Sequence, residues 1–302
     1  MRLTRFSKGG RIGLAIGDGR GYRGWMSSDE KYPGDLTPDL IRKLSLADLE
    51  AVLSAGTEID VETVDFLPPF AGSSKMICVG LNYADHSAET GFKVPDYPTV
   101  FPRFASSLIG HLAPIIKPVS SDQLDYEGEV AVVLSKGGRY IPRDQALSHV
   151  LGYSIFNDAS IRDFQLRTPQ WTIGKNFDGT GAFGPSLVTA EDLPGGAAGL
   201  SIVTRLNGTV VQSANTNDLV FSVAALISDL SQTMTLQAGD AIITGTPAGV
   251  GAGRKPPLWM KDGDVCEVEV EGLGLLRNVV KNEQATDSLH DNLKGGRVVE
   301  YS

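Results

Sequence analysis

Three carboxylates are the residues of this sequence whose types and spacing most directly suggest chemistry. Glu127 and Glu129 open an apolar, β-branched run that continues to Leu134, and Asp158 closes a second such run. Residues two apart on a strand point to the same face, so the two Glu side chains are expected side by side. Adjacent carboxylates repel each other, and a cation between them is the simplest way to keep both ionised. Oxygen ligands without Cys or His nearby favour Mg²⁺, Mn²⁺ or Ca²⁺ over zinc.

A solvated outer face of a strand is the alternative interpretation of a Glu-x-Glu pair. Ala131 and Val133 share the face of Glu127 and Glu129, and both are apolar. The face is therefore predicted to be buried. Because unpaired carboxylates are costly to bury, this burial favours a bound cation.

A candidate general base lies in a short helix expected near residues 82–90. His86 and Glu89 are three residues apart, so they share a helix face and can form a hydrogen bond. A carboxylate beside an imidazole raises the basicity of the ring and fixes its tautomer, which suits deprotonation of water. The alternative is an incidental pair on a surface helix.

Further polar residues follow the third carboxylate. Arg162 and Gln165 share a helix face and are candidates to bind a carboxylate or carbonyl oxygen, unless the helix is simply solvated. Lys175 has apolar neighbours; near a bound metal its pKa would be lowered, which suits a proton donor or an electrostatic clamp. Thr246 stands in a Gly-rich loop after a buried strand, where an oxyanion can bind, although such loops are also plain strand exits.

The elements that must position these residues are mostly strands. Strands are predicted at 76–80, 129–135, 151–156, 184–189, 201–206, 240–244 and 265–270, and helices near 82–90, 143–150 and 218–231. Strands and helices do not alternate regularly, which disfavours a doubly wound α/β sheet and favours a mixed, mainly β fold. Asn207-Gly208 predicts a β-hairpin over 202–211.

Two units are predicted along the chain. Residues 1–70 have the pattern of a small N-terminal α+β domain, and residues 67–74 that of a linker. The larger, catalytic domain is predicted at 75–302.

Composition narrows the possible partners. The 302 residues carry a formal net charge of −9, which argues against nucleic acid and anionic membranes and leaves a small anionic substrate with a local positive site. Cys78 and Cys266 lie in apolar runs and are expected to be reduced. A signal-peptide pattern is missing, and no apolar run approaches about 20 residues, so a cytoplasmic protein without a membrane partner is expected.

Five motifs in order resemble the fumarylacetoacetate hydrolase family, in its acylpyruvate hydrolase and 2-hydroxyhepta-2,4-diene-1,7-dioate isomerase-like branch. They are Val-Gly-Leu-Asn-Tyr-Ala-Asp-His, Asp-Tyr-Glu-Gly-Glu, Phe-Asn-Asp-Ala-Ser-Ile-Arg-Asp-Phe-Gln, Trp-Thr-Ile-Gly-Lys-Asn-Phe-Asp and Thr-Gly-Thr-Pro-Ala-Gly-Val-Gly. The resemblance covers roughly residues 75–280. It implies a mixed β-sandwich roll with a small, variable N-terminal domain, and a homodimer or larger assembly.

The resemblance also implies roles for the candidate residues. Glu127, Glu129 and Asp158 match Mg²⁺ or Mn²⁺ ligands, with Ca²⁺ as a substitute in crystals. His86 and Glu89 match a base dyad on a lid helix. The remaining matches are contacts to substrate or transition state: Arg162, Gln165, Lys175 and Thr246.

The expected reaction is metal-dependent hydrolysis of the C3–C4 bond of a 2,4-dioxo acid, which gives pyruvate and a carboxylic acid. Decarboxylation of oxaloacetate and isomerisation of a 2-hydroxy-dienoate are alternatives, because both use the same enolate. A metal-binding scaffold without catalysis is a further alternative, which the presence of His86 and Lys175 disfavours.

One departure from the family pattern suggests where specificity lies. Many relatives read Phe-x-Lys-Pro where this chain has Phe101-Pro102-Arg103-Phe104, and residues 92–98 lengthen the lid region. The hypothesis is that Arg103 or Lys93 contacts a distal group of the substrate.

Overall fold

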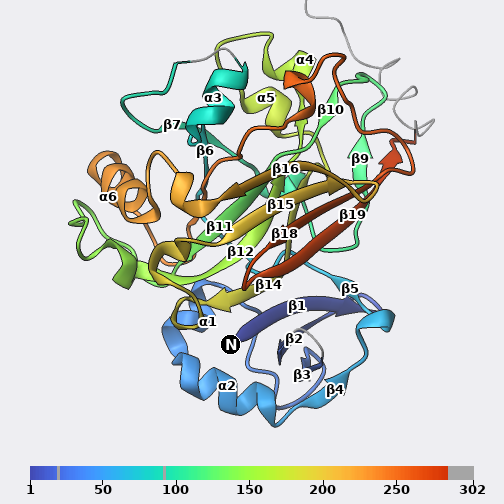
Figure 1. The fold of residues 1–302 in the computed structure, drawn as a ribbon. Coiled ribbons are helices and arrows are strands. Elements are labelled where there is room, and N and C mark those ends of the chain that lie inside the picture. Colours follow the sequence, from blue (N-terminus) through green and yellow to red (C-terminus); the bar gives the residue numbers. More distant parts are fainter. Residues whose placement is uncertain (19–20, 91–92, 285–302) are drawn as a thin grey trace, which may run out of the picture.

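Strands dominate the computed structural model, which describes residues 1–18, 21–90 and 93–284 (Figure 1). The part of the predicted larger domain after residue 284 lies outside the described residues. The strands are Arg2–Lys8 (β1), Arg11–Gly17 (β2), Tyr22–Met26 (β3), Thr57–Ile59 (β4), Asp65–Phe66 (β5), Met76–Gly80 (β6), Thr99–Pro102 (β7), Leu108–Ile109 (β8), Ile115–Lys117 (β9), Leu124–Asp125 (β10), Gly128–Leu134 (β11), Val150–Asp158 (β12), Ser160–Ile161 (β13), Gly181–Thr189 (β14), Ser201–Leu206 (β15), Thr209–Asn215 (β16), Ala241–Ile243 (β17), Val265–Val270 (β18) and Gly274–Asn282 (β19).

The helices are short. The α-helices are Pro38–Lys43 (α1), Leu46–Ser54 (α2), Ala84–Thr90 (α3), Arg162–Gln165 (α4), Thr172–Lys175 (α5) and Val223–Thr233 (α6). The 3₁₀ helices are Val61–Thr63 (η1), Ala105–Ser107 (η2), Ala146–His149 (η3), Ala190–Asp192 (η4), Gly195–Ala197 (η5), Thr216–Asp218 (η6) and Gly251–Gly253 (η7). None of the helices in the described part of the chain is long and apolar enough to span a membrane. The predicted mainly β fold with short helices is confirmed.

A large mixed sheet connects the two ends of the molecule. Its strand order is β4-β3-β2-β1-β14-β12-β11-β17-β6-β7, with β5 paired to β1 and β8 paired to β14. A five-stranded sheet in the order β16-β15-β18-β19-β9 and the pair β10-β13 complete the architecture. Within the large sheet β11 and β12 are antiparallel, whereas β17 and β6 are parallel.

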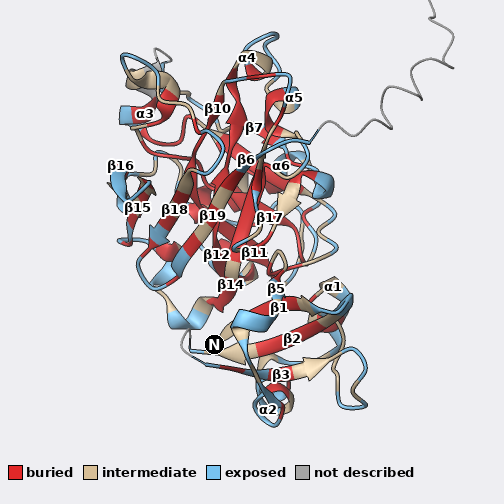
Figure 2. Cartoon of the chain, turned by 90° about the vertical axis from the view of Figure 1, so that its right-hand side faces the viewer, coloured by how far each residue is buried: buried red, intermediate tan, exposed pale blue. Residues whose placement is uncertain are grey.

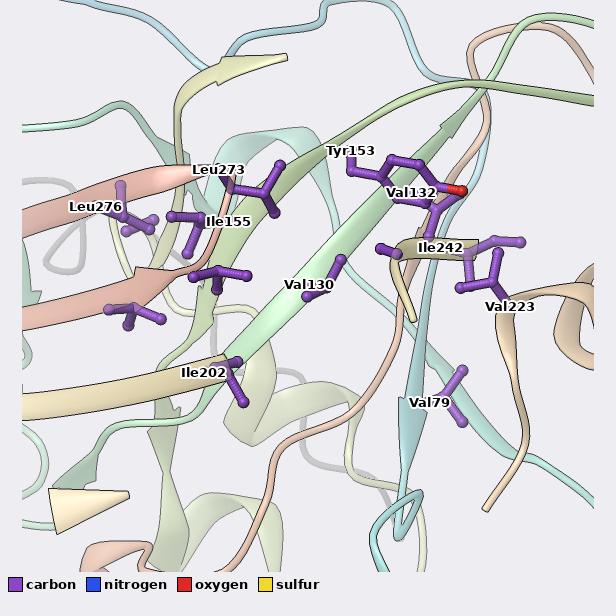
Figure 3. Packing of buried hydrophobic residues seen from close by; sticks show 14 of the residues in the cluster. Val79, Val130, Val132, Tyr153, Ile155, Ile202, Val223, Ile242, Leu273 and Leu276 are labelled. Atoms are coloured by element: carbon purple, nitrogen blue, oxygen red, sulfur yellow. The ribbon is translucent and has the colours of Figure 1, made fainter. Parts of the chain in front are cut away.

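The central strand β11 is buried along its whole length (Figure 2). On one face, Val130 packs in a cluster with Ile202 of the five-stranded sheet (Figure 3). On the other face, Ala131 and Val133 belong to a second buried cluster. Glu129 lies on this second face by the alternation of a strand, and it is 2% exposed. The prediction that this face is buried is confirmed.

The N-terminal residues share a sheet and a core with the rest of the chain. Strand β1 pairs antiparallel with β14, where Leu3 lies opposite Leu187. Leu14 and Leu49 join the same buried cluster as Ala131. The strands of the predicted small α+β unit of residues 1–70 therefore continue the sheet that carries the carboxylates (Figure 1). Its separation from residues 75–302 as a domain stays a prediction.

The hairpin predicted over 202–211 is confirmed. β15 and β16 are antiparallel, and the φ values of Asn207 and Gly208 between them are 52° and 78°. Both are positive, as a type I′ turn requires. The helix predicted near 143–150 is only the 3₁₀ turn η3, and the one near 218–231 begins later, after the N-cap Ser222.

Candidate active site

The three carboxylates meet where the start of β11 lies beside the end of β12. Glu127 immediately precedes β11, Glu129 lies in it, and Asp158 is the last residue of β12. Gly128 pairs with Asn157, and the Asp158 N–H donates to the Glu127 carbonyl at 2.9 Å. One carboxylate oxygen from each residue lies within 4.8 Å of the others. The three predicted ligands are thus brought together, although Asp158 is 29 positions or more from the pair and was joined to it through the ordered motifs.

Two basic residues that line the cavity described below, Lys175 and Arg162, bind the carboxylates. Lys175 Nζ, at the end of α5, lies 2.6 Å from Glu127 Oε2 and 2.7 Å from Asp158 Oδ2. Arg162 Nη1, at the start of α4, lies 2.7 Å from Glu127 Oε1. Burial by itself would raise the pKa of Glu127, but Lys175 and Arg162 lower it to about 2. Glu127 therefore remains ionised.

The pKa of Lys175 is also set by its partners. Burial would lower the pKa of this ammonium group, but Asp158 and Glu127 outweigh burial and raise it. Lys175 is thus held as a cation between the two carboxylates, as an electrostatic clamp requires, and its role as a proton donor stays a prediction.

Glu129 is the carboxylate that lacks a full positive partner among the described residues. Its Oε2 accepts a 2.5 Å hydrogen bond from the Gly245 N–H. Burial, followed by Asp158 and Glu127, raises its pKa well above the usual value. A divalent cation among the three carboxylates would supply the missing positive charge. The oxygen donors and the unbalanced charge fit such a cation.

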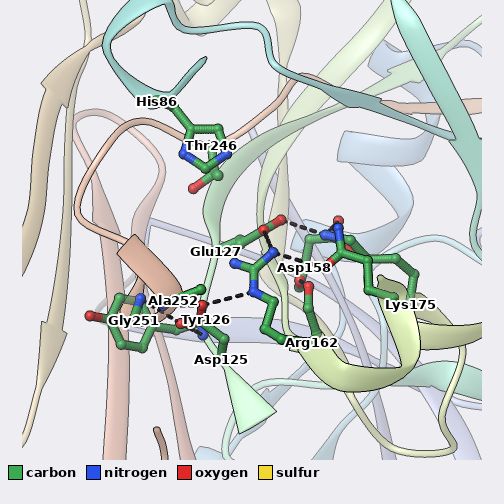
Figure 4. A network of polar contacts seen from close by, with 12 residues as sticks. His86, Asp125, Tyr126, Glu127, Asp158, Arg162, Lys175, Thr246, Gly251 and Ala252 are labelled. Carbon is green, nitrogen blue, oxygen red and sulfur yellow. Dashed lines mark hydrogen bonds and ion pairs between the residues drawn. The ribbon is translucent and has the colours of Figure 1, made fainter. Parts of the chain in front are cut away.

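Asp125 supports this arrangement, and sequence reasoning missed it. Its side chain is fully buried and accepts hydrogen bonds from Gly251 N–H at 2.7 Å and Ala252 N–H at 2.9 Å. It also accepts from Arg162 Nε at 2.8 Å, so Arg162 lies between Asp125 and Glu127 (Figure 4). The signal was present in the Asp-Tyr-Glu-Gly-Glu motif, where only the two Glu residues were assigned a role.

A cavity of about 290 Å³ opens above the carboxylates. We call its buried side, made by Glu127, Glu129, Asp158, Lys175 and Arg162, the cavity floor. We call the set of the buried His86, the half-buried Glu89 and Arg254 and the exposed Lys255 the cavity mouth. Apart from Asp158, all of these residues line the cavity.

His86 and Glu89 lie on α3 with their side chains facing each other. His86 Nδ1 is 3.7 Å from Glu89 Oε2, which is longer than a hydrogen bond, although such contacts often tighten when substrate binds. Both Glu89 oxygens accept from the Gly249 N–H, at 3.1 and 2.9 Å. Burial would raise the pKa of Glu89, but His86 and the Gly249 N–H lower it overall. An ionised Glu89 can therefore orient the imidazole.

The predicted substrate contacts also line the cavity. Arg162 Nη2 is buried and has no hydrogen-bond partner among the described residues, so a donor remains for a ligand. Gln165 Oε1 accepts from Arg162 Nη1 at 2.9 Å. The Thr246 hydroxyl donates to the Gly128 carbonyl at 3.1 Å and accepts from Gln212 Nε2 at 2.8 Å.

Arg103 lies behind the floor, and neither it nor Lys93 is among the described residues that line the cavity. Arg103 Nε donates to Asp158 Oδ1 at 2.6 Å, and its Nη2 donates to the Ala159 carbonyl. Its side chain is fully buried. This placement contradicts the hypothesis that Arg103 contacts a distal substrate group. Its fork of donors instead orients a metal-ligand candidate.

Arg254 and Lys255 are cavity residues that sequence reasoning missed. They directly follow η7, the turn whose N–H groups Asp125 holds. The available signal was two consecutive cations after the Gly-rich loop that contains Thr246. These residues place positive charge at the mouth.

The chain is similar to several known proteins. The model of the fumarylacetoacetate (FAA) hydrolase C-terminal domain matches residues 75–281. A mitochondrial oxaloacetate tautomerase of Homo sapiens is 40% identical over 288 residues, which are 93% of this chain and 91% of that protein. A solved fumarylacetoacetate hydrolase from Exiguobacterium antarcticum has a TM-score of 0.81 at 36% identity and covers 94% of this chain and 100% of its own. A solved maleylpyruvate hydrolase from Sphingobium has a TM-score of 0.75 at 28% identity, with the same coverage.

Proposed function

The chain belongs to the fumarylacetoacetate hydrolase family of enzymes, and from this premise we propose that it interconverts the keto and enol forms of an oxaloacetate-like 2-oxo acid. The proposal includes a divalent cation, Mg²⁺ or Mn²⁺, held by Glu127, Glu129 and Asp158. The observation that carries it is the cavity floor, where three carboxylates and an Arg162 donor without a partner lie together. The 40% identity to an oxaloacetate tautomerase supports the choice of substrate. A cytoplasmic location stays a prediction, since that relative is named as mitochondrial.

Each floor residue has a role that its contacts support. A divalent cation bound here would polarise the 2-oxo group and stabilise negative charge on its oxygen. Arg162 Nη2 can bind the neighbouring carboxylate of the substrate, because Nη1 and Nε are already engaged by Glu127 and Asp125. Lys175 keeps Glu127 and Asp158 in place and adds positive charge.

His86 is the group proposed to move the proton. Its Nδ1 faces Glu89, so proton exchange with substrate would use Nε2. In the keto-to-enol direction the C3–H bond breaks, its electrons form the C2–C3 double bond, and the oxygen on C2 gains a proton. The same steps run backwards in the other direction.

Hydrolysis of an acylpyruvate is a second candidate. The pair of His86 and Glu89, in which Glu89 is held by the Gly249 N–H, favours it. His86 would take a proton from water, which adds to the 4-carbonyl. The C3–C4 bond then breaks, its electrons pass to the pyruvate enolate, and C3 is protonated. The similarity to a maleylpyruvate hydrolase supports this alternative.

One set of assays separates the candidates. Enol-oxaloacetate loss, CO₂ release from oxaloacetate and acid release from acetylpyruvate are measured with Mg²⁺, with Mn²⁺ and after EDTA. We expect metal-dependent acceleration of the keto–enol step without matching CO₂ release. Faster acid release from acetylpyruvate than keto–enol exchange would favour the hydrolase. No acceleration of any reaction by either metal would contradict the proposed function.

A further inference from the structure

The geometry points to a second anion-binding subsite at the cavity mouth, formed by Arg254 with Lys255 beside it. We infer that it binds the distal carboxylate of the substrate, so the enzyme selects 2-oxo dicarboxylic acids over 2-oxo monocarboxylic acids. This inference rests on the proposed function, because the first carboxylate and the 2-oxo group are taken to lie on the floor.

Arg254 is anchored, but not by an acid. Its Nη2 donates to the Val211 carbonyl at 2.7 Å, and its Nε reaches the Tyr126 hydroxyl at 3.2 Å and the Gly249 carbonyl at 3.3 Å. All three acceptors are neutral. Within residues 1–18, 21–90 and 93–284, Nη1 makes no hydrogen bond. The guanidinium group is therefore fixed in place with one amino group available.

The other two arginines around the floor differ in this respect. Arg103 lies 2.6 Å from Asp158, and Arg162 lies 2.8 Å from Asp125 and 2.7 Å from Glu127. In the described part of the chain, ion pairs involve neither Arg254 nor Lys255. The positive charge of Arg254 helps to lower the pKa of Glu89 from a longer distance, but both Glu89 oxygens accept from the Gly249 N–H. A half-buried guanidinium group without a direct ion pair is costly, and an anionic ligand would offset that cost.

The charge around the mouth is positive. Arg254 and Lys255 contribute two positive charges, and Glu89 contributes one negative charge, which leaves one positive charge. Both Glu89 oxygens accept from the Gly249 N–H, so this carboxylate is directed to the backbone. A substrate carboxylate can accept a charge-assisted hydrogen bond from the one amino group of Arg254 that is available.

The backbone that carries Arg254 is held firmly. The preceding turn η7 is fixed by Asp125 through Gly251 and Ala252. The same Asp125 binds Arg162 on the floor. One buried carboxylate thus sets the relative positions of the two arginines, which would contact opposite ends of a dicarboxylate.

The test uses two unreactive ligands that differ in the distal group alone. Malate has a distal carboxylate where 2-hydroxybutanoate has a methyl group. Titration calorimetry on the Mn²⁺-loaded protein is expected to show at least tenfold tighter binding of malate. Arg254→Gln should weaken malate binding about tenfold or more and leave 2-hydroxybutanoate unchanged. Lys255→Gln should weaken malate binding two- to fivefold, because its exposed charge is screened by solvent.

Arg139→Gln is the matched control, because Arg139 also donates to a backbone carbonyl, that of Gln232, but lies outside the cavity lining. Its ligand affinities should equal those of the wild type. Equal binding of both ligands by the wild type, or equal losses for both in Arg254→Gln, would overturn the inference. Unchanged malate binding in Lys255→Gln would remove Lys255 from the subsite. Turnover of oxaloacetate is measured in parallel: its absence contradicts the proposed function, whereas the malate preference tests the subsite.

Discussion

The floor and the mouth of the cavity both carry charges of two signs, but they hold them in different ways. On the floor, Lys175 and Arg162 contact Glu127 directly at 2.6 and 2.7 Å, and all three are buried. At the mouth, Glu89 and Arg254 are held mainly by backbone groups. Charges on the floor are thus paired within the protein, whereas those at the mouth remain available to a ligand.

This difference suggests a division of labour under the proposed function. A floor of cross-linked charges is suited to stabilise an enolate whichever reaction forms it. A mouth with available charges is suited to select the substrate. Substitutions in the floor, in the mouth and in the residue that connects them test whether the two regions act separately.

The largest effect is expected for Glu127→Gln on the floor. The change removes a candidate metal ligand and one partner each of Lys175 and Arg162. Metal-dependent turnover of every substrate should fall by about 10³-fold or more. The measurement is steady-state activity at saturating Mg²⁺, with a folded far-UV circular dichroism spectrum as a condition. Glu267→Gln, at a surface pair with Arg277, is the control and should keep full activity. Retained turnover in Glu127→Gln would break the assignment of the floor.

His86→Ala should slow proton transfer more than decarboxylation. Loss of a general base costs about 10²–10⁴-fold, and we expect that loss for keto–enol exchange and for acylpyruvate hydrolysis, because His86 is proposed to move a proton in both. Decarboxylation of oxaloacetate, which needs no such base, should change far less. Mn²⁺ affinity should not change, because His86 belongs to the mouth. His149→Ala, outside the cavity, is the control. Equal losses in hydrolysis and in decarboxylation would show that His86 does not activate water.

Asp125→Asn tests the connection between the regions. The amide keeps the shape of the side chain but loses the charge that pairs with Arg162 at 2.8 Å. Mn²⁺ affinity should fall about 10- to 100-fold, the usual cost of losing support behind metal ligands. Asp240→Asn is a close control, because Asp240 is also fully buried with backbone donors and a Lys75 partner, but lies away from the cavity. If both variants lowered the melting temperature and neither changed Mn²⁺ affinity, Asp125 would have a structural role alone.

The smallest effect is expected for Gly253→Ala at the mouth. A Cβ at this position would lie 2.5 Å from Glu89 Cδ, so the Glu89 side chain must move away. The orientation of His86 should suffer, and hydrolysis should slow by about tenfold, which corresponds to roughly 1.4 kcal/mol. Gly195→Ala, where the new Cβ meets only an ordinary contact at 3.6 Å, is the control. A loss of Mn²⁺ affinity in Gly253→Ala would contradict the separation of mouth from floor.

The fold and the floor could be predicted from the sequence to a large extent. The apolar, β-branched run identified β11, and the Asn207-Gly208 turn identified the hairpin, because both signals are local. Ordered motifs identified Glu127, Glu129 and Asp158 as neighbours.

What the sequence did not show depends on long-range contacts. Arg103 was expected at the substrate, but antiparallel pairing of β7 with β6 places it behind Asp158. Arg254 is bonded to Tyr126, and Asp125 is bonded to Gly251 and Ala252. Each of these hydrogen bonds joins residues more than 80 positions apart, so local sequence patterns do not indicate them. The pairing of β1 with β14 is also long-range and joins residues 1–70 to the large sheet. Local sequence patterns indicate a separate unit instead.

The most direct test of the central claim is an anomalous difference map from a crystal soaked in Mn²⁺. The account predicts one strong peak among the carboxylate oxygens of Glu127, Glu129 and Asp158. A map without density between these three side chains, or with the manganese bound elsewhere, would contradict it.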